Sequence, residues 1–408
     1  MKNSPRIFVN ANVLPTVVVI TMLMVLSVLV LLSLWEMESQ LFVRNTYIKA
    51  RRADLRSALA LYCSYPGIYA QGGTNTVTLY DSVASSEVKF DRFSWGLYEA
   101  VSVTSTYGRV NISALTGLRR DSRHNTALYC ANNNGSLTLT GHTNIRGLIY
   151  VPKNGIIYGQ MRSVFFSGEK ISPSEIKVSA PALPEPDGQA KRDATRLLDL
   201  LDGSKEPLSA DSVTVSFYGD NEPLILSVQE RLMENRQLSG RVVLTADKVR
   251  IDSTCTLDNI IVVGKSVTIG HGFRGALQVF ASDSLILEQR VQLEYPSGIY
   301  STNYAELNDE AVVNGYAVVQ PSNSPDVRKR NYFQSRQACV RGLLYVDGNA
   351  QLQGIVSGTA YISRAVYYSN EGYYKDMVYD ATVLCGGQMV HPMWLNARGQ
   401  REIIKYVE

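Results

Sequence analysis

The sequence predicts a mostly β protein: a three-faced β-solenoid with insertions, preceded by one transmembrane helix and an amphipathic stem helix. Three observations predict this fold: an uncharged apolar run near the N-terminus, an apolar stripe that follows it, and a six-residue period in much of the remainder. With 408 residues, 45% of them hydrophobic and 19% charged, the chain can bury a large core and is too apolar for extensive disorder. A net charge of +3 argues against a nucleic-acid binder.

The apolar run covers 13–35 and contains no charged residue. At about 1.5 Å per residue it crosses a hydrocarbon core of about 30 Å, so we expect one transmembrane helix after a short tail at 1–12. The run is too long for the apolar region of a signal peptide, and no cleavage pattern of small residues follows it before Glu36 and Glu38. These features favour a retained anchor.

The charges beside the span leave its orientation open. Two basic residues precede the span, whereas four follow it between Arg44 and Arg52, and this count favours a cytoplasmic C-terminal side. Glu36 and Glu38 come first after the span, however, and large domains often cross a membrane despite such charges. We expect a single-pass protein of the bacterial inner membrane with its soluble domain outside the cytoplasm.

A stem helix is expected over 36–63, because apolar residues recur there at a spacing of seven while basic residues occupy other faces. The stripe requires a surface to pack against. That surface is either the chain's own globular part or a helix partner in an assembly, and the spacing leaves both open. The candidate assembly residues are Leu41, Ile48, Leu55, Leu59 and Tyr62.

A long apolar segment that continues into an amphipathic helix and then a β-rich domain resembles the pilin-like and pseudopilin-like proteins of bacterial type IV pilus and type II secretion systems. The resemblance covers about the first 65 residues. It lacks one family feature, a Gly followed by an apolar run with Glu at the fifth mature position. The resemblance implies a structural role in an envelope assembly.

The strongest pattern is the six-residue period through 241–299, where every sixth position from Val243 is apolar for nine steps. Because alternate residues of a strand share a face, each unit predicts a short strand with two inward side chains. Three units make an 18-residue coil, and stacked coils share one apolar interior. The expected solenoid core contains Val249, Ile251, Ile261, Val263, Val267, Ile269, Val279, Leu285 and Leu287.

The period recurs in two further blocks, and we expect all three blocks to be coils of one solenoid. The two blocks also match each other directly, since RGLIYV at 146–151 resembles RGLLYV at 341–346. A helix is expected from Gly188 to Asp202, ended by Gly203. The further blocks are 137–163 and 337–364, and the segments between them are a β-rich leading segment at 64–136, an insertion with a Pro-rich linker and a helix at 164–240, a polar insertion at 300–336 and a Tyr-rich cap at 365–408.

The run RGLLYVDGNAQLQGIVSG, which begins at Arg341, resembles bactofilins, the polymer-forming bacterial β-helix proteins. The resemblance covers roughly 130 residues in pieces and implies a scaffold on the cytoplasmic face of the membrane. A rival resemblance to hexapeptide-repeat acyltransferases rests on small or acidic residues such as Asp252 and Gly264 after the second inward position. Bulky residues such as Phe273 at the other inward position argue against that rival.

No residue pattern predicts a catalytic, cofactor-binding or metal site. The four histidines, His124, His142, His271 and His391, lack the spacing of a metal site, and only His271, at an expected turn, is a candidate base for an acyltransferase. The five cysteines, Cys63, Cys130, Cys255, Cys339 and Cys385, are too far apart for a CxxC motif. Cys255 holds an inward position, and the other four are able to form two disulfides in an exported domain. No base or oxyanion donor is placed for a Cys385 nucleophile.

Two surface features suit contacts with other molecules. Outward carboxylates fit either a solvated face or the groove of a polysaccharide-active enzyme: Asp247, Asp252, Asp258, Asp283 and Glu288. A tyrosine cluster at 361–379 fits protein or glycan contacts, or a half-buried end cap. We therefore expect a non-catalytic envelope protein that binds other envelope proteins or further copies of itself. The alternatives are a β-helix enzyme acting on polysaccharide, an acyltransferase, and a cytoplasm-facing scaffold.

Overall fold

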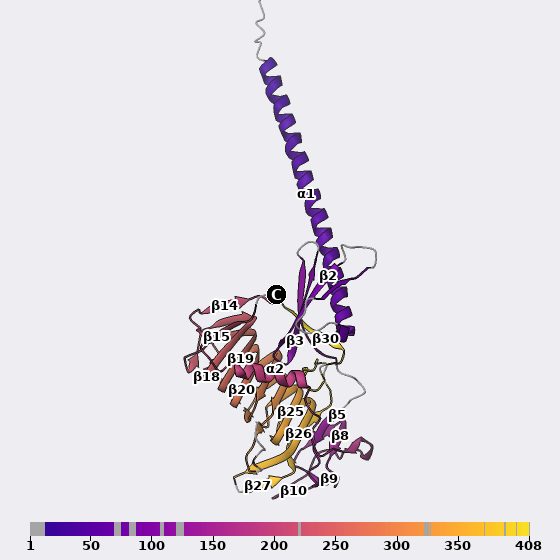
Figure 1. The fold of residues 1–408 in the computed structure, drawn as a ribbon, viewed down its shortest axis with the longest axis vertical. Coiled ribbons are helices and arrows are strands. Elements are labelled where there is room, and N and C mark those ends of the chain that lie inside the picture. Colours follow the sequence, from indigo (N-terminus) through magenta and orange to yellow (C-terminus); the bar gives the residue numbers. More distant parts are fainter. Residues whose placement is uncertain are drawn as a thin grey trace, which may run out of the picture.

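The protein combines a long N-terminal helix, a small antiparallel sheet and a much larger set of parallel strands (Figure 1). The predicted mostly β fold with one long apolar N-terminal helix is confirmed. The expected tail at 1–12 lies outside the described residues. The computed structural model describes residues 13–68, 75–80, 87–106, 110–119, 126–218, 222–321, 326, 328–370, 372–386, 389–396 and 398–407.

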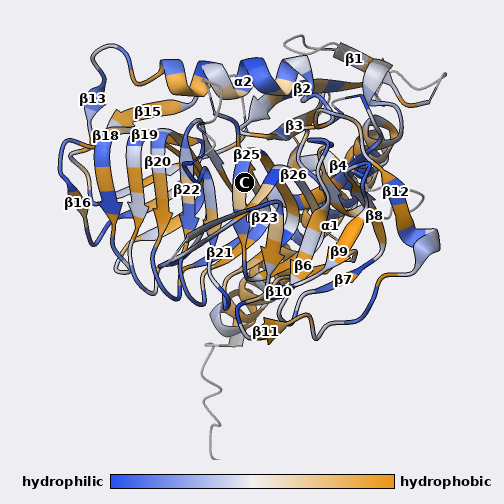
Figure 2. Cartoon of the chain, turned by 90° about the horizontal axis from the view of Figure 1, so that it is seen from below, coloured by the Kyte–Doolittle hydropathy of each residue, from blue (hydrophilic) through white to orange (hydrophobic). Residues whose placement is uncertain are grey.

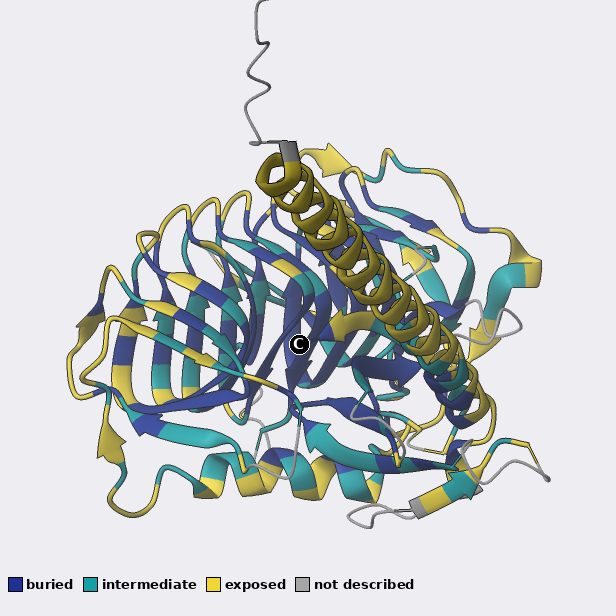
Figure 3. Cartoon of the chain, turned by 90° about the horizontal axis from the view of Figure 1, so that it is seen from above, coloured by how far each residue is buried: buried dark blue, intermediate teal, exposed yellow. Residues whose placement is uncertain are grey.

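Helix α1 runs from Val13 to Ser64 without interruption, so the expected span and stem form one helix. Pro15 lies in the first turn, where its missing N–H breaks no helical hydrogen bond. The most apolar part of α1 makes no contact that buries it and is exposed in Figure 3, and the helix projects from the body in Figure 1. Within the described part of the chain, α1 is the one helix long and apolar enough to cross a membrane.

The lower part of α1 packs on an antiparallel sheet with the strand order β1-β2-β3-β4-β30. Leu55 and Leu59 of α1 meet Phe90 and Val101 of this sheet, and all four side chains are buried. The last strand comes from the C-terminal segment, so the foot of α1 and the C-terminal segment pack in one small core. The strands are β1 (Asn75–Thr78), β2 (Glu87–Trp95), β3 (Tyr98–Ser105), β4 (Asn111–Leu118) and β30 (Arg401–Val407).

Most other strands pair in parallel and form one closed sheet, which we call the parallel stack together with the adjoining sheet β28-β6-β9. Val249 pairs with Val267, and Val267 pairs with Leu285, so neighbouring strands lie 18 residues apart along the chain. The longest strands of the closed sheet are β18 (Val242–Ile251), β19 (Thr256–Ile269), β20 (Arg274–Leu287), β21 (Gln292–Ser301), β23 (Val312–Val319), β25 (Cys339–Leu352) and β26 (Ile355–Ser369). Its shorter strands are β5 (Thr126–Cys130), β7 (Asn144–Arg146), β8 (Leu148–Val151), β12 (Ile176–Val178), β13 (Glu206–Pro207), β14 (Ser212–Val215), β15 (Leu224–Ser227), β16 (Leu232–Met233), β17 (Gln237–Gly240), β22 (Tyr304–Leu307), β24 (Tyr332–Gln334), β27 (Gly372–Lys375) and β29 (Thr382–Leu384). The adjoining sheet contains β6 (Leu137–Thr140), β9 (Ile156–Tyr158) and β28 (Met377–Tyr379), and β10 (Gln160–Met161) and β11 (Val164–Phe165) form a small hairpin.

The interior of the stack is mainly hydrophobic, and the buried Gln334 amide also lies in it, where it donates 2.9 Å hydrogen bonds to the carbonyl oxygens of Ala338 and Ile355. Seven of the nine expected core residues lie in it: Val249, Ile251, Val267, Ile269, Val279, Leu285 and Leu287. The other two, Ile261 and Val263, are also buried but belong to a second cluster on the outer side of the sheet, while Ile260 and Val262 point inward. Asn259 adopts a left-handed conformation (φ 57°) at a register shift in β19. It is one extra residue relative to the neighbouring strand, so the side chains after it lie on the opposite face from the one that the period predicts.

The chain does not build the stack in sequence order. Strand β5 pairs with β26 on one side and with β8 on the other, and β12 pairs with β8. The first strands of the stack in the sequence therefore extend it beyond the last ones. After β12 the chain returns to the far end and winds back from β15 and β18 toward β26.

A segment at 179–202, which we call the strap, makes this return along the outside of the stack. The Tyr345 hydroxyl donates a 3.1 Å hydrogen bond to the carbonyl oxygen of Pro184 in its extended part. Its helix α2 (Gly188–Asp199) is close to the expected one, and Ala190 and Ala194 bury their side chains against the outer face of the stack. Figure 2 shows α2 alongside β18, β19 and β20.

Two expected boundaries differ from the structure. The segment 300–336 is no excursion, because β22, β23 and β24 belong to the closed sheet and point Ala305, Leu307 and Val313 inward. The polar residues that alternate with these inward residues face outward, and they make the six-residue apolar period difficult to recognise in this segment. The segment 365–408 is no simple cap, because β29 joins the stack and β30 joins the antiparallel sheet.

The repeated Arg-Gly pattern marks a conformation that requires glycine. Gly342 has a φ of 124°, and Gly147 of the matching motif has a φ of 118°. A Cβ atom on Gly342 would lie 2.0 Å from the carbonyl oxygen of Gly315 in the neighbouring strand. Both the backbone angle and the close approach exclude larger residues at this position.

Candidate functional site

The two halves of the stem have different surroundings. Leu55, Leu59 and Tyr62 are completely buried against the chain's own antiparallel sheet, so a partner cannot reach them. Packing on the chain's own globular part, one of the two expected alternatives, accounts for these three residues. Leu41 is 49% exposed, and Ile48 is partly buried at the upper limit of the docked region.

Helix α1 remains apolar beyond the uncharged run at 13–35. Glu36 and Glu38 follow this run, but Phe42, Val43 and Tyr47 beyond them are 71%, 63% and 40% exposed. Large exposed apolar side chains on a helix are a common sign of a contact surface. We call residues 41–48 the upper stem.

At the foot of α1, four polar side chains form a buried group that we call the foot network: Tyr62, Arg92, Glu99 and Arg401. The Tyr62 hydroxyl donates a hydrogen bond to the Glu99 carboxylate. Arg401 Nε lies 3.1 Å from Glu99 Oε2, and Arg92 Nη1 lies 3.7 Å from Glu99 Oε1. Burial and the Glu99 charge raise the pKa of Tyr62 well above its usual range. The network therefore joins α1, β2, β3 and β30 through one carboxylate.

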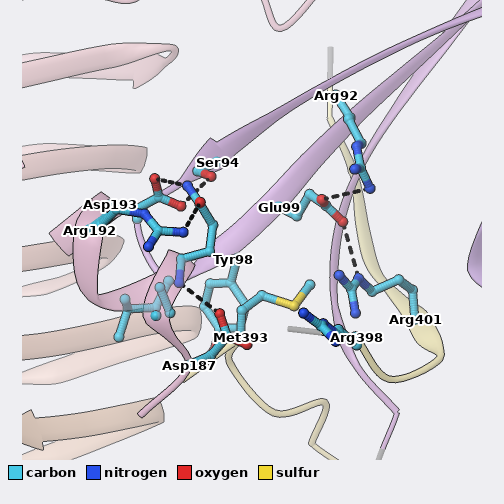
Figure 4. A pocket seen from close by; sticks show the side chains of 15 residues that line it. Arg92, Ser94, Tyr98, Glu99, Asp187, Arg192, Asp193, Met393, Arg398 and Arg401 are labelled. Atoms are coloured by element: carbon cyan, nitrogen blue, oxygen red, sulfur yellow. Dashed lines mark hydrogen bonds and ion pairs between the residues drawn. The ribbon is translucent and has the colours of Figure 1, made fainter. Parts of the chain in front are cut away.

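A cavity of about 340 Å³ lies beside the foot network (Figure 4). Its walls come from the turn between β2 and β3, the first turn of α2, and the C-terminal segment that contains Met393 and Arg398. Figure 4 shows Glu99 between Arg92 and Arg401 on one side, with Arg192 and Asp193 of α2 on the other. We call α1 together with the antiparallel sheet the helix–sheet unit. The cavity thus lies where the helix–sheet unit meets the strap.

Gln278 of the stack holds the turn between β2 and β3 in place. Its side-chain amide donates 2.8 Å to the carbonyl oxygen of Trp95 and accepts 3.0 Å from Leu97 N–H. The Trp95 indole donates 3.1 Å to the carbonyl oxygen of Asn259. Gly96 has a φ of 64°, and a Cβ atom there would lie 2.0 Å from Gln278 Oε1. These hydrogen bonds and the close packing at Gly96 therefore orient the antiparallel sheet against the stack.

Protein-family models, curated proteins and solved structures give no match for this chain. What the site does is therefore inferred from its own residues and their contacts.

The predicted histidines lie apart from the cavity. His271 is exposed, and its backbone N–H donates 2.9 Å to Glu288. His142 is exposed with Nδ1 3.3 Å from Ser167 Oγ, and His391 pairs through its backbone with Leu118. His124 lies outside the described residues. Among the described residues, no group of three or more His, Cys, Asp or Glu side chains is arranged to hold a metal ion.

No disulfide joins any of the five cysteines, and Cys130, Cys255 and Cys339 are buried. Burial raises the pKa of Cys130 to about 12, and burial also raises the pKa of Cys63 to about 11 although the Arg401 charge lowers it. Thiols with such pKa values are poor nucleophiles near neutral pH. Cys385 is partly buried beside the interior of the stack, away from the cavity residues.

The predicted outward carboxylates each contact a neighbour on the surface. Asp247 lies 2.9 Å from Lys265, and Glu288 lies 2.8 Å from Arg250. Asp283 accepts a hydrogen bond from Asn303, and Asp258 pairs with Lys405. Asp252 accepts from the Thr254 N–H, and this hydrogen bond lowers the pKa of Asp252. These contacts are those of a solvated charged face.

The tyrosine cluster lies on the hairpin of β26 and β27, where Tyr367 pairs with Tyr374 and Tyr368 pairs with Tyr373. The four rings are half-buried, and Tyr379 is buried beside them. Arg336 lies over the Tyr379 ring at 5.4 Å. The cluster contributes a small core of its own at the side of the stack.

An aromatic row on the outer face of the stack escaped the sequence analysis. Tyr129 and Tyr361 have ring centroids 5.7 Å apart, and Tyr300 and Tyr345 each lie 5.7 Å from Trp394. The strap and the C-terminal segment cover this row. The sequence does contain a recurring signal for this row, a tyrosine between two inward residues. It occurs as LYC at 128–130, IYV at 149–151, LYV at 344–346 and AYI at 360–362. Glu99 and Arg401 had no comparable signal, because they are 302 residues apart in the sequence.

Proposed function

We propose that this protein is a non-catalytic, membrane-anchored structural component of a bacterial envelope assembly, and that it binds protein partners through the upper stem. The observation that carries the proposal is the exposure of Phe42, Val43 and Leu41 beyond the span, on a helix whose lower part is rigidly docked. A docked foot holds the apolar upper stem at a defined position above the body. Such a preordered helix face suits a helical partner.

The proposal extends to the body of the protein. We take the parallel stack to be a three-faced solenoid, and its 18-residue register together with its continuous apolar interior supports this. The helix on an antiparallel sheet supports the pilin-like interpretation of the N-terminal part. A partner would then be another envelope protein or a second copy of this chain, with the soluble domain outside the cytoplasm.

The positions of the candidate catalytic groups favour binding over chemistry. His271 and Cys385 lie in different parts of the stack and neither lines the cavity. The outward carboxylates are engaged with surface neighbours. An enzyme acting on polysaccharide, or an acyltransferase, therefore remains the less supported function.

A crosslinking experiment in cells tests the upper stem. A photoreactive amino acid at Phe42 or Val43 should give protein adducts in the envelope, whereas the same residue at Arg56 on the docked part of α1 should give few. Charged variants Leu41→Glu and Val43→Glu should abolish the adducts formed from position 42, and Thr46→Glu is the matched control. Equal crosslinking at all positions would contradict a specific surface.

Topology reporters separate the exported component from the cytoplasm-facing scaffold. A reporter that works only outside the cytoplasm and a fluorescent reporter as its complement are fused after Glu408. Activity of the first reporter supports the exported, pilin-like role. Fluorescence alone would contradict it and would favour the bactofilin-like scaffold, in agreement with the count of basic residues beside the span.

A further inference from the structure

The cavity beside the foot network has more positive than negative charge on its walls. Four arginines line it, and the acidic residues that line it are three: Glu99, Asp187 and Asp193. The four arginines are Arg92, Arg192, Arg398 and Arg401.

The three acids are already engaged. Glu99 holds Arg92 and Arg401. Asp187 Oδ1 caps α2 by accepting 2.8 Å from the N–H of Gln189. Asp193 accepts 2.6 Å from the Ser94 hydroxyl and 2.8 Å from the Gln189 amide. None of them is left to neutralise a further guanidinium group within the cavity.

Two of the arginines are correspondingly free of acidic partners. In the part of the chain that the structure describes, neither Arg192 nor Arg398 makes an ion pair, and both are exposed at the rim of the cavity. Arg192 donates 2.8 Å only to the neutral Gln189 amide. Deeper in the cavity, Arg92 Nε is buried without a hydrogen-bond partner. A buried donor without an acceptor is unfavourable, and an entering acceptor would correct it.

We infer that this cavity binds a small oxyanion, a carboxylate or a phosphate, between Arg192 of the strap and the group of Arg398 and Arg401. Guanidinium groups bind both anions with paired N–H donors, which favours them over a halide. The first turn of α2 lies at the same cavity and adds a favourable dipole for an anion. The inference is independent of the proposed assembly role, since it involves no residue of the upper stem.

The ligand would also act on the fold. The cavity walls come from α2 of the strap, from β2 and β3, and from the C-terminal segment. An anion held between Arg192 and Arg398 would join these three parts. Through Arg401 and Glu99 it would also steady Tyr62 at the foot of α1. Binding should therefore stabilise the docking of the stem.

Thermal unfolding of the full chain in a non-ionic detergent tests the inference, with sodium phosphate and sodium citrate as separate probes and sodium chloride at matched ionic strength as the reference. We expect a saturable rise in Tm of about 2–4 °C with at least one probe. A response to phosphate alone, to citrate alone or to both supports the site and identifies the anion class. No saturable rise with either probe would overturn it.

Variants locate the effect. Arg398→Ala and Arg192→Ala change exposed rim residues, so both proteins should fold, and each should lose most of the anion-dependent rise measured from its own baseline. Arg274→Ala removes an exposed arginine on the stack far from the cavity and should keep the full rise. An equal rise in all three variants would show an adventitious ion effect only and would also overturn the inference. Isothermal titration with the stronger probe gives an independent measure on the same proteins.

Discussion

The helix–sheet unit and the parallel stack solve the problem of burial in opposite ways. The stack buries a continuous and mainly hydrophobic interior that runs through its successive strands. The helix–sheet unit has a small apolar core and adds a buried carboxylate with two arginines and a tyrosine. An apolar side chain in the stack can be exchanged for another apolar side chain of similar volume at small cost, whereas a single buried carboxylate between named donors cannot be replaced in this way.

This difference indicates a division of roles. The stack supplies bulk stability and a platform, because its parallel strands share one continuous interior. The foot network contributes little net stability for its size but specifies how α1 sits on the sheet. Its geometry then decides where the upper stem stands relative to the body.

The largest effect is expected when the foot network loses its acid. Glu99→Ala leaves Arg401, whose side chain is 5% exposed, without its charge partner, and should destabilise the protein by about 3–5 kcal/mol. Urea unfolding of the full chain in detergent measures this change. The control is Glu402→Ala, because Glu402 is an exposed acid beside Arg401 on β30. This change should alter the unfolding free energy by less than about 0.5 kcal/mol. A mild Glu99→Ala phenotype would remove the distinction between the two regions.

Truncation inside the stack should cost nearly as much. Leu285 is completely buried between Val267 and Ala305 of the neighbouring strands, and Leu285→Ala should destabilise by about 2–5 kcal/mol. Leu285→Met keeps the volume and should stay below about 1.5 kcal/mol. The same urea unfolding experiment compares them, and equal costs would argue against a tightly packed interior.

The contact between the two regions should be weaker than either core. Gln278→Ala leaves the Leu97 N–H and the Trp95 carbonyl without their partner, and should cost about 1–3 kcal/mol. Hydrogen exchange should rise at 95–98 while the interior of β19 and β20 stays protected. Gln289→Ala on an exposed turn is the control. Faster exchange throughout the stack would contradict a local junction.

Each region also contains a thiol that responds to alkaline pH, the partly buried Cys63 in the helix–sheet unit and the buried Cys130 in the stack. The pKa of Cys63 is raised to about 11 by burial, and that of Cys130 to about 12 by burial and the Asp376 charge, from ordinary values near 9. A raised pKa in the folded state adds stability that is present below pH 9 and is lost as pH rises through the folded value. The urea midpoint should therefore fall between pH 9 and pH 10, before most tyrosines ionise. Cys63→Ser and Cys130→Ala should each flatten this fall, and an unchanged slope in both would contradict it.

The smallest effect is expected on the outer surface of the stack. Lys265 and Asp247 form an ion pair at 2.9 Å, but both side chains are largely exposed. Lys265→Ala should change the unfolding free energy by at most about 1 kcal/mol, and less at high salt. Paired measurements at low and high salt check both statements. A large cost would mean that the charged face is more than solvated surface.

The sequence by itself determined the features that depend on neighbouring residues. The apolar run and the stripe after it predicted α1, and the pattern at 188–202 predicted α2 closely. The six-residue period identified inward residues correctly wherever the strands kept their register, as at Val249 and Leu285. The matching RGLIYV and RGLLYV motifs share one local conformation, because Gly147 and Gly342 both adopt a positive φ that favours glycine.

The tertiary structure alone decided what depends on distant parts of the chain. It placed the first strands of the stack beyond the last ones, since a parallel strand can pair with any matching edge and the six-residue period does not number the strands. A single left-handed Asn259 turned Ile261 and Val263 outward, where the strap and the antiparallel sheet bury them. Glu99 found Arg401 only through the folded chain, because an ion pair leaves no periodic trace in a sequence.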